Sequence, residues 1–247
     1  MATVAIGDVH GNRPALDDLL ARLEPELRPE DIVVFLGDYI DRGPDSRGCI
    51  DRILDLARDS SASIVTLVGN HEDWLMASLR DHYRHDWLLG MDGFDTIASY
   101  SRELAAELRH QAEAAGTGLY DGRVSLPYDR FFDLLPAAHI AFLRDLRVFH
   151  RSPDALCVHG GYDPRVGAIE SQPRENLIWG SARFLRSYDG PDEVVYGHWN
   201  NAVLDANGWP QPAFGPASIG LDTISHGVLS AVRLPDRRVF QSARFEC

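Results

Sequence analysis

Two different spacings of apolar residues alternate along the first eighty positions of the chain. Short apolar runs predict buried strands at Thr3–Ile6, at Ile32–Leu36 and in the run SIVTLV that starts at Ser63. Each run is followed by apolar residues three and four positions apart, a spacing typical of helices. In the first helix these residues are Leu16, Leu19, Leu20 and Leu23. This repeated strand–helix order predicts an α/β fold with a mostly parallel sheet flanked by helices.

The pattern changes after residue 80. Residues 81–150 are polar and aromatic, and their helical signals at 95–114 and 139–145 predict an inserted helical cap. Strand patterns return in the segments DALCVHGG, EVVYGH, ASIGLD and GVLSAVRL, which predict a second, mixed sheet in the last hundred residues. Because no linker or low-complexity run interrupts the chain, we expect residues 1–247 to form a single domain.

Composition narrows the possible functions. The formal net charge of −13 argues against stable nucleic-acid binding, which requires a basic face. All 24 basic residues are Arg, so the chain has neither a catalytic lysine nor a Walker-type phosphate loop. It lacks an apolar run long enough to span a membrane and a recognisable signal peptide. Together with three scattered cysteines, these features predict a cytoplasmic protein with no membrane association.

Polar residues flanked by glycine follow five of the predicted strands. They occur in GDVHG, GDYIDRG, GNHE, VHGG and YGH. Any one of them has an ordinary explanation as a turn cap or a surface ion pair. As a set they favour a site, because the carboxyl ends of parallel strands meet at one edge of a sheet. Nitrogen and oxygen ligands without cysteine suit Mn, Fe or Zn, and a central Asp can bridge two ions about 3.5–4 Å apart.

The ordered motifs Asp-x-His, Gly-Asp-x-x-Asp-Arg-Gly, Gly-Asn-His-Glu, His-Gly-Gly and Gly-His resemble those of the calcineurin-like metallophosphoesterases. The segments GDYIDRG and GNHE further resemble the phosphoprotein phosphatase branch in its small bacterial form. This resemblance implies a four-layer sandwich of two mixed β-sheets flanked by helices. It also implies metal-dependent phosphomonoester hydrolysis, with phosphoserine or phosphothreonine in a protein, or a small phosphoester, as the substrate. A symmetrical dinucleoside tetraphosphate hydrolase is the alternative, and a non-catalytic metal-binding scaffold is a third hypothesis.

Carried over to this chain, the resemblance assigns a role to each motif. Asp8 and His10 would hold one metal ion, and Asp38 would bridge it to a second. The ligands of the second ion would be Asn70, His159 and His198. A hydroxide bridging two ions would attack phosphorus, with Mn as the favoured metal and Fe, Zn, Ni or Mg as alternatives. In this scheme His71 protonates the leaving group, Asp41 orients His71 and Arg42 binds the phosphate.

One segment departs from the family pattern. Related bacterial phosphatases often carry Leu-Trp-x-Arg, whose Arg makes a second phosphate contact. Here the segment reads LIWGSARFL, with Ser181 in the place of that Arg and Arg183 two residues later. Arg183 is therefore the predicted second phosphate ligand, with Arg165 and Arg174 as alternatives. We expect Trp179 and Trp199 to be buried and Glu72 to support the site without binding metal. The sequence gives no signal for an oligomeric state.

Overall fold

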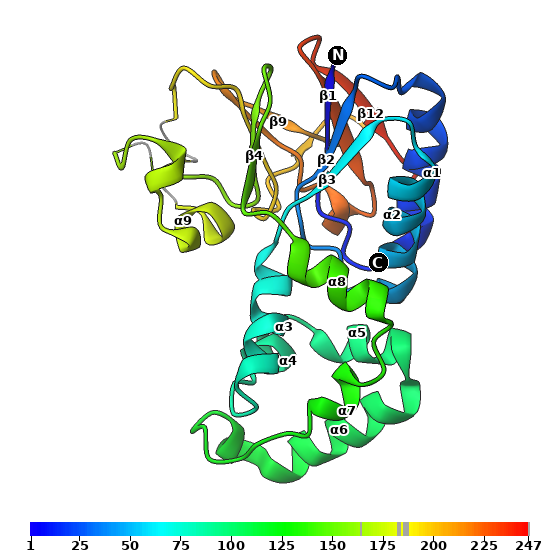
Figure 1. The fold of residues 1–247 in the computed structure, drawn as a ribbon, viewed down its shortest axis with the longest axis vertical. Coiled ribbons are helices and arrows are strands. Elements are labelled where there is room, and N and C mark those ends of the chain that lie inside the picture. The colour runs from blue at the N-terminus through cyan, green and yellow to red at the C-terminus, as the bar shows by residue number, and fades with distance from the viewer. Residues whose placement is uncertain (164, 182–183, 185–187, 247) are drawn as a thin grey trace.

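Two five-stranded sheets lie face to face in the computed structural model of the chain (Figure 1). The structure describes residues 1–163, 165–181, 184 and 188–246. The first sheet contains, in order, β12 (Arg238–Gln241), β11 (Ser230–Leu234), β1 (Thr3–Ile6), β2 (Ile32–Phe35) and β3 (Ser63–Thr66). The second contains β4 (Phe149–Arg151), β5 (Leu156–Val158), β6 (Val194–Tyr196), β10 (Ser218–Gly220) and β9 (Ala213–Phe214). A separate ribbon pairs β7 (Val203–Leu204) with β8 (Pro210–Gln211).

The alternation of side chains along the strands produces the layers. In β1, Val4 and Ile6 face one way and pack with helices α1 (Arg13–Leu23) and α2 (Ser46–Asp59). Ala5, between them, faces the other way and packs in the core shared by the two sheets. The far face of the second sheet packs against residues around helix α9 (Arg174–Trp179). Helices, two sheets and an outer layer therefore give the four-layer arrangement that the resemblance implied.

Capping residues determine where the first helices begin. The side chain of Asn12 accepts a hydrogen bond from the backbone N–H of Ala15, 3.1 Å away, and Pro14 occupies the first turn of α1. Asp45 caps α2 in the same way by accepting from the N–H of Gly48. Both helices therefore begin shortly after the loops that follow β1 and β2. The polar residues of those loops are consequently held between a strand and a helix.

A helical region lies between β3 and β4 in the sequence and extends beyond one end of the two sheets in Figure 1. Its helices are α3 (Asn70–Arg80), α4 (Asp86–Gly90), α5 (Gly93–Tyr100), α6 (Arg102–Ala115), α7 (Asp129–Phe132) and α8 (Ala137–Asp145). Their buried residues, such as Trp87 and Phe131, belong to the same apolar cluster as the residues beneath α1 and α2. Among the helices that the structure describes, none has both the length and the apolar character required to cross a bilayer.

The structure confirms the predicted strands but corrects the position of some. Strand β11, predicted in the second sheet, belongs to the first, where it pairs antiparallel with β1. Strand β12, which was not predicted, pairs antiparallel with β11 in the same sheet. Strand β4 begins at Phe149, inside the segment predicted as a helical cap. The helical signal at 95–114 corresponds to two helices, because the Oγ of Ser101 caps the new helix α6. The short strands β7, β8 and β9 had no readable signal.

Candidate metal centre and its surroundings

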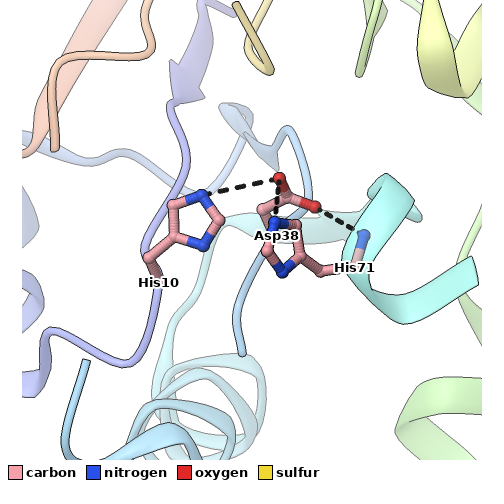
Figure 2. A group of neighbouring side chains, drawn as sticks. All are labelled: His10, Asp38 and His71. Atoms are coloured by element: carbon pink, nitrogen blue, oxygen red, sulfur yellow. Dashed lines mark hydrogen bonds and ion pairs between the residues drawn. The ribbon is translucent and has the colours of Figure 1, made fainter. Parts of the chain in front are cut away.

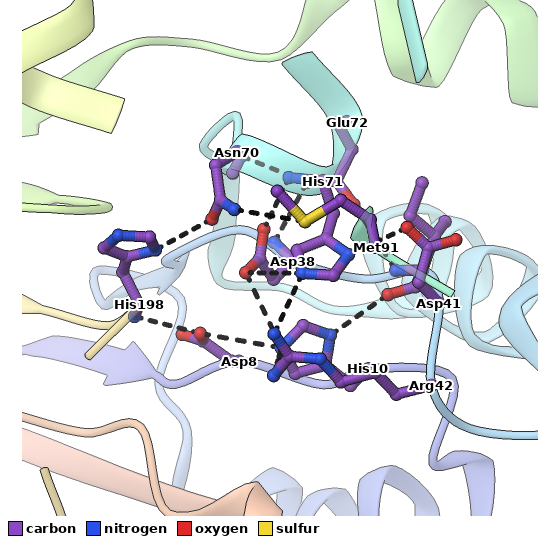
Figure 3. Close-up of polar contacts among 12 residues, drawn as sticks. Asp8, His10, Asp38, Asp41, Arg42, Asn70, His71, Glu72, Met91 and His198 are labelled. Carbon is purple, nitrogen blue, oxygen red and sulfur yellow. Dashed lines mark hydrogen bonds and ion pairs between the residues drawn. The ribbon is translucent and has the colours of Figure 1, made fainter. Parts of the chain in front are cut away.

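The loops that follow β1, β2, β3, β5 and β6 meet at one edge of the two sheets (Figure 3). Backbone hydrogen bonds hold the loops together: the N–H groups of Val9 and His10 donate to the carbonyl of Asp38. In the second sheet, the N–H of Gly197 donates to the carbonyl of His159. Across the sheets, the N–H of His198 donates to Oδ2 of Asp8 at 2.9 Å. The polar side chains of these loops therefore converge on a single buried space.

The first group of converging side chains consists of His10, Asp38 and His71 (Figure 2). Oδ2 of Asp38 lies 3.6 Å from Nε2 of His10 and 3.9 Å from Nε2 of His71. Asp8 joins from β1, with its Oδ2 3.9 Å from Nε2 of His10. The other nitrogen of His10 is 3.1 Å from the carbonyl of Ile40, which orients the ring. One edge of each ring therefore faces the shared Asp38 carboxylate.

The second group consists of Asp38, His159 and His198, with Asn70 among them. Oδ1 of Asn70 lies 2.8 Å from Nε2 of His159 and 2.9 Å from Nδ1 of His198. Nε2 of His159 is also 3.4 Å from Oδ2 of Asp38. Four ligand atoms of the types that divalent metals accept are thus directed at one point. Asp38 belongs to both groups, so its carboxylate lies where a residue bridging two ions would be needed.

The donor set and its surroundings fit cations. Oδ1 of Asp8 is buried and has no hydrogen-bond partner among the described residues, and the same holds for Oδ1 of Asp222. A buried carboxylate oxygen without a donor is costly unless a cation or proton satisfies it. The Nδ1 of His159 lies 2.9 Å from the carbonyl of Leu36, an outer contact that commonly orients a metal-binding imidazole.

Charges inside this buried space shift one another strongly. Burial, together with the charge of Asp222, raises the pKa of Asp8 well above its usual value. Burial also opposes ionisation of Asp38, but the rings of His159 and His71 outweigh it and lower the pKa of Asp38 well below its usual value. Conversely, the Asp38 carboxylate overcomes burial and raises the pKa of His159 to about 10. Asp38 is therefore the carboxylate around which the other charges are arranged.

His71 is held by a second carboxylate. Its Nδ1 lies 2.8 Å from Oδ2 of Asp41, and both side chains are buried. Asp41 is fixed in turn by the helical region: the indole N–H of Trp87 donates to Oδ2 at 2.9 Å, and the hydroxyl of Thr96 donates to Oδ1. Burial opposes charge on His71, but Asp38 and Asp41 outweigh it and raise its pKa. His71 therefore keeps its proton to a higher pH than an ordinary histidine.

The guanidinium of Arg42 lies against the same rings. One of its nitrogens is 2.9 Å from Nε2 of His10, and the other is 3.2 Å from Nε2 of His71. Figure 3 shows the side chain directed at the centre of the group. A planar guanidinium in this position can present two N–H donors to an oxyanion bound beside His71.

Unusual backbone conformations aim these side chains. Positive φ values occur at residues that are not glycine, a conformation that favours Gly and costs about 1–3 kcal/mol where it is retained. The residues concerned near the centre are His10, Asp38, Asp41, Arg42 and His198. The buried carboxylate of Glu72 stabilises this arrangement by accepting from the backbone N–H groups of Asp38, Tyr39 and Gly69. Burial and the charge of Asp38 raise the pKa of Glu72 to about 7.

Nine of the ten predicted site residues are therefore brought together, while Arg183 lies outside the described residues. The alternative arginines are engaged elsewhere: Arg165 pairs with Asp163, and Arg174 pairs with Asp73. Trp179 and Trp199 are partly exposed, which corrects the expectation that both are buried, because each lies beside the open edge of the centre. Glu72 supports the loops, as expected.

Three contributors were missed by sequence reasoning. Asp222 is buried, accepts from the N–H of Asn200 and raises the pKa of Asp8. Its signal was present, because GLD follows a predicted strand as GD does elsewhere. Trp87 and Thr96 left no such signal, because they reach Asp41 only through the packing of α4 and α5.

Comparison with known proteins gives consistent matches. Residues 1–223 match the model of the calcineurin-like phosphoesterase family. A symmetrical bis(5'-nucleosyl)-tetraphosphatase of Janthinobacterium sp. (strain Marseille) is 28% identical over 98% of this chain and 96% of its own length. A serine/threonine-protein phosphatase 1 of Salmonella typhimurium is 38% identical over 44% of each chain. A solved structure assigned as a candidate diadenosine tetraphosphatase has a TM-score of 0.64 and 20% identity, covering 100% of this chain and 95% of its own.

Proposed function

The chain belongs to the calcineurin-like phosphoesterase family. From this premise we propose that it hydrolyses phosphomonoesters such as phosphoserine or phosphothreonine, in which the leaving group is a poor one. The observation that carries the proposal is the pairing of His71 with Asp41 next to the group of metal-ligand side chains. A poor leaving group needs a proton as its bond to phosphorus breaks, and a positioned imidazole can supply it.

The proposed metal ligands follow the two groups of side chains. Asp8, His10 and Asp38 hold one divalent ion, and Asp38, Asn70, His159 and His198 hold the other. When bound, two such ions lower the pKa of a shared water and neutralise charge on the phosphoryl oxygens. The ligands are nitrogen and oxygen atoms without sulfur, which several divalent metals accept; we take Mn as the favoured metal, with Fe, Zn, Ni and Mg as alternatives.

We assign His71 to proton transfer and not to metal binding, although its Nε2 faces Asp38. Its Nδ1 is committed to Asp41, which fixes the tautomer and orientation of the ring and favours its protonated form. Nε2 then carries the proton towards the leaving oxygen. Arg42 binds the phosphoryl group, because its guanidinium lies within reach of both His10 and His71. The second phosphate contact assigned to Arg183 stays a prediction from sequence.

Dinucleoside tetraphosphate hydrolysis is the second candidate. Its support is the relative from Janthinobacterium, which this chain matches over nearly the whole of both lengths. The distinction rests on Asp41: a phosphoanhydride has a good leaving group and gains little from an acid, so a buried dyad held by Trp87 and Thr96 favours the phosphomonoester.

As part of the proposal, we keep the division into one domain with a helical cap, and a cytoplasmic location.

A substrate panel with Mn²⁺ tests the function. Its members are a phosphoserine peptide, an aryl phosphate, a dinucleoside tetraphosphate and a phosphodiester, with the Asp38→Asn variant as the inactive control. We expect phosphate release from the peptide, with kcat/KM above that for the tetraphosphate. Hydrolysis of the tetraphosphate alone would establish the second candidate, and absence of turnover on every substrate by Mn²⁺-loaded protein would support the scaffold.

A further inference from the structure

A groove of about 500 Å³ runs between helices α3 and α9, beside the metal-ligand side chains. It lies within the size range of small-molecule sites, which are commonly about 300–1,000 Å³. Trp74 and Trp179 line it from the two helices, and no role in the proposed hydrolysis uses either residue. The proposed hydrolysis therefore leaves the chemistry of this groove unassigned.

The two indoles form an aromatic wall. Their ring centroids are 4.7 Å apart with an interplanar angle of 47°, and both side chains are partly exposed. Trp179 also contacts the ring of His198 edge to face, with centroids 6.0 Å apart. One molecule could therefore stack a planar group on this wall and place its phosphate at the centre, with the ring of His198 between the two.

Polar groups around the wall complement a nucleotide. The side chain of Asn176 lines the groove from α9, and amides of this kind pair with the edges of purine bases. Arg80 and Arg84 supply positive charge on the α3 side of the groove. Arg84 forms an ion pair with Asp86 at 3.4 Å, and no such pair of Arg80 occurs among the described residues. Two acidic residues also line the groove: Asp73 is neutralised by Arg174, and Glu175 offers acceptors to an exocyclic amino group.

We propose that this groove binds the nucleobase of a phosphorylated nucleoside, stacked on Trp74 and Trp179. Any base can stack on aromatic side chains. Edge contacts at Asn176 and Glu175 would favour a purine over an apolar peptide side chain. The proposal rests on phosphoester hydrolysis at the adjoining centre, and it names nucleotides as the substrate class that this side of the centre accommodates. A nucleoside monophosphate is itself a phosphomonoester with a poor alkoxide leaving group, so the inference is compatible with the proposed hydrolysis.

Equilibrium binding to the Mn²⁺-loaded protein tests the groove without turnover. The probe is α,β-methylene-ADP, whose bridging P–C bonds resist hydrolysis, and the matched ligand is methylenediphosphonate, which lacks the nucleoside. We expect calorimetry to show that the nucleoside raises affinity by about 5- to 150-fold, the range of base–aromatic stacking. Equal affinity for the two ligands overturns the proposal.

Variants locate the binding. Trp74→Ala should remove most of the gain for α,β-methylene-ADP, and Trp74→Phe should keep most of it because a ring remains. Trp209→Phe is the control: this partly exposed indole lies under Arg244 and donates to Gln241, outside the groove. If Trp74→Ala binds the probe as the wild type does, the base lies elsewhere and the proposal is wrong. Arg80→Gln should weaken the probe but leave binding of adenosine itself unchanged.

The same measurements separate this inference from the proposed function. Probe binding that depends on Trp74 would support the groove even if no substrate in the panel released phosphate. Hydrolysis of phosphopeptides combined with no affinity gain from the nucleoside would support the enzyme and overturn the groove. A Trp74-dependent gain for a tyrosine-containing phosphopeptide, with none for α,β-methylene-ADP, would identify a peptide as the occupant and also overturn it.

Discussion

The two sheets contribute unequally to the centre. Loops after β1 and β2 and the start of α3 carry His71 and Asp41, assigned to proton transfer, and Arg42, assigned to phosphate binding. The same segments carry the proposed ligands Asp8, His10, Asp38 and Asn70 (Figure 3). The second sheet contributes the proposed ligands His159 and His198, which lie in the group around Asn70, and Asp222, which raises the pKa of Asp8. In the proposed mechanism, the first half of the molecule therefore carries the groups for proton transfer, while the second completes one of the two candidate ligand groups. This division predicts different consequences for changes in each half.

The largest effect is expected at the residue shared by both groups. Asp38→Asn removes the charge around which His10, His71 and His159 are arranged, so both ions should be lost with nearly all turnover. The loss should exceed the about 10²–10⁴-fold typical of a missing general acid. Measuring the metal content of Asp38→Asn and of His198→Asn sharpens the comparison, because the second variant should lose only one ion. Full metal content with normal rates in Asp38→Asn would refute the shared role.

The next effect separates chemistry from metal binding within the first half. His71→Asn should keep both ions, because the ligands around Asp38 and Asn70 remain. Its kcat should fall about 10²–10⁴-fold with a phosphoserine peptide and far less with an aryl phosphate, whose leaving group needs the proton least. Steady-state rates with the two substrates decide the matter. Equal losses on both would mean that His71 acts on the metals or on the fold.

A shift in pH dependence should follow from Asp41→Asn. The acid must be protonated, and Asp38 and Asp41 raise the pKa of His71 against the effect of burial. Activity on alkyl phosphates should therefore fall as pH rises through the pKa of His71 in the wild type. Without the charge of Asp41 that pKa drops, so the fall should begin at lower pH. Profiles of kcat against pH measure this, and an unmoved alkaline limb in the variant would contradict it.

The smallest effect concerns the helical region, which reaches the first half through Asp41. Thr96→Val keeps the shape of this buried side chain but removes its hydroxyl, and Thr96→Ser keeps the hydroxyl as the control. The valine loses the donor to Oδ1 of Asp41 and an acceptor for the N–H of Asp41, but the indole of Trp87 and the hydroxyl of Ser46 remain as partners. The kcat on alkyl phosphates should therefore fall by roughly 2- to 10-fold. A reduction of the same size in both variants would indicate a packing defect.

The sequence predicted those parts of the molecule whose signal is local. A run such as Thr3–Ile6 followed by Gly-Asp predicts both a strand and polar residues at its end, and the resemblance of the ordered motifs then assigned those residues as candidate ligands. The sheet that β11 joins could not be read, because an apolar strand pattern is the same for either partner. Trp87 and Thr96 meet Asp41 through tertiary packing, which no spacing encodes. Asp222 could have been predicted, because it follows a predicted strand after a glycine, as Asp8 and Asp38 do.

The hydrogen bond from the N–H of His198 to Asp8 joins residues 190 positions apart. A side chain at Gly197 would collide with Oδ1 of Asp8, so the two sheets also meet there without room for adjustment. At 5–20 residues per second, a ribosome adds the segment between these residues in roughly 10–40 s. For most of that interval the nascent chain presents Asp8, His10 and Asp38 without the partners from the second sheet. The complete set of proposed ligands is therefore available only late in synthesis or after release, so metal uptake by both proposed sites would indicate that folding is finished.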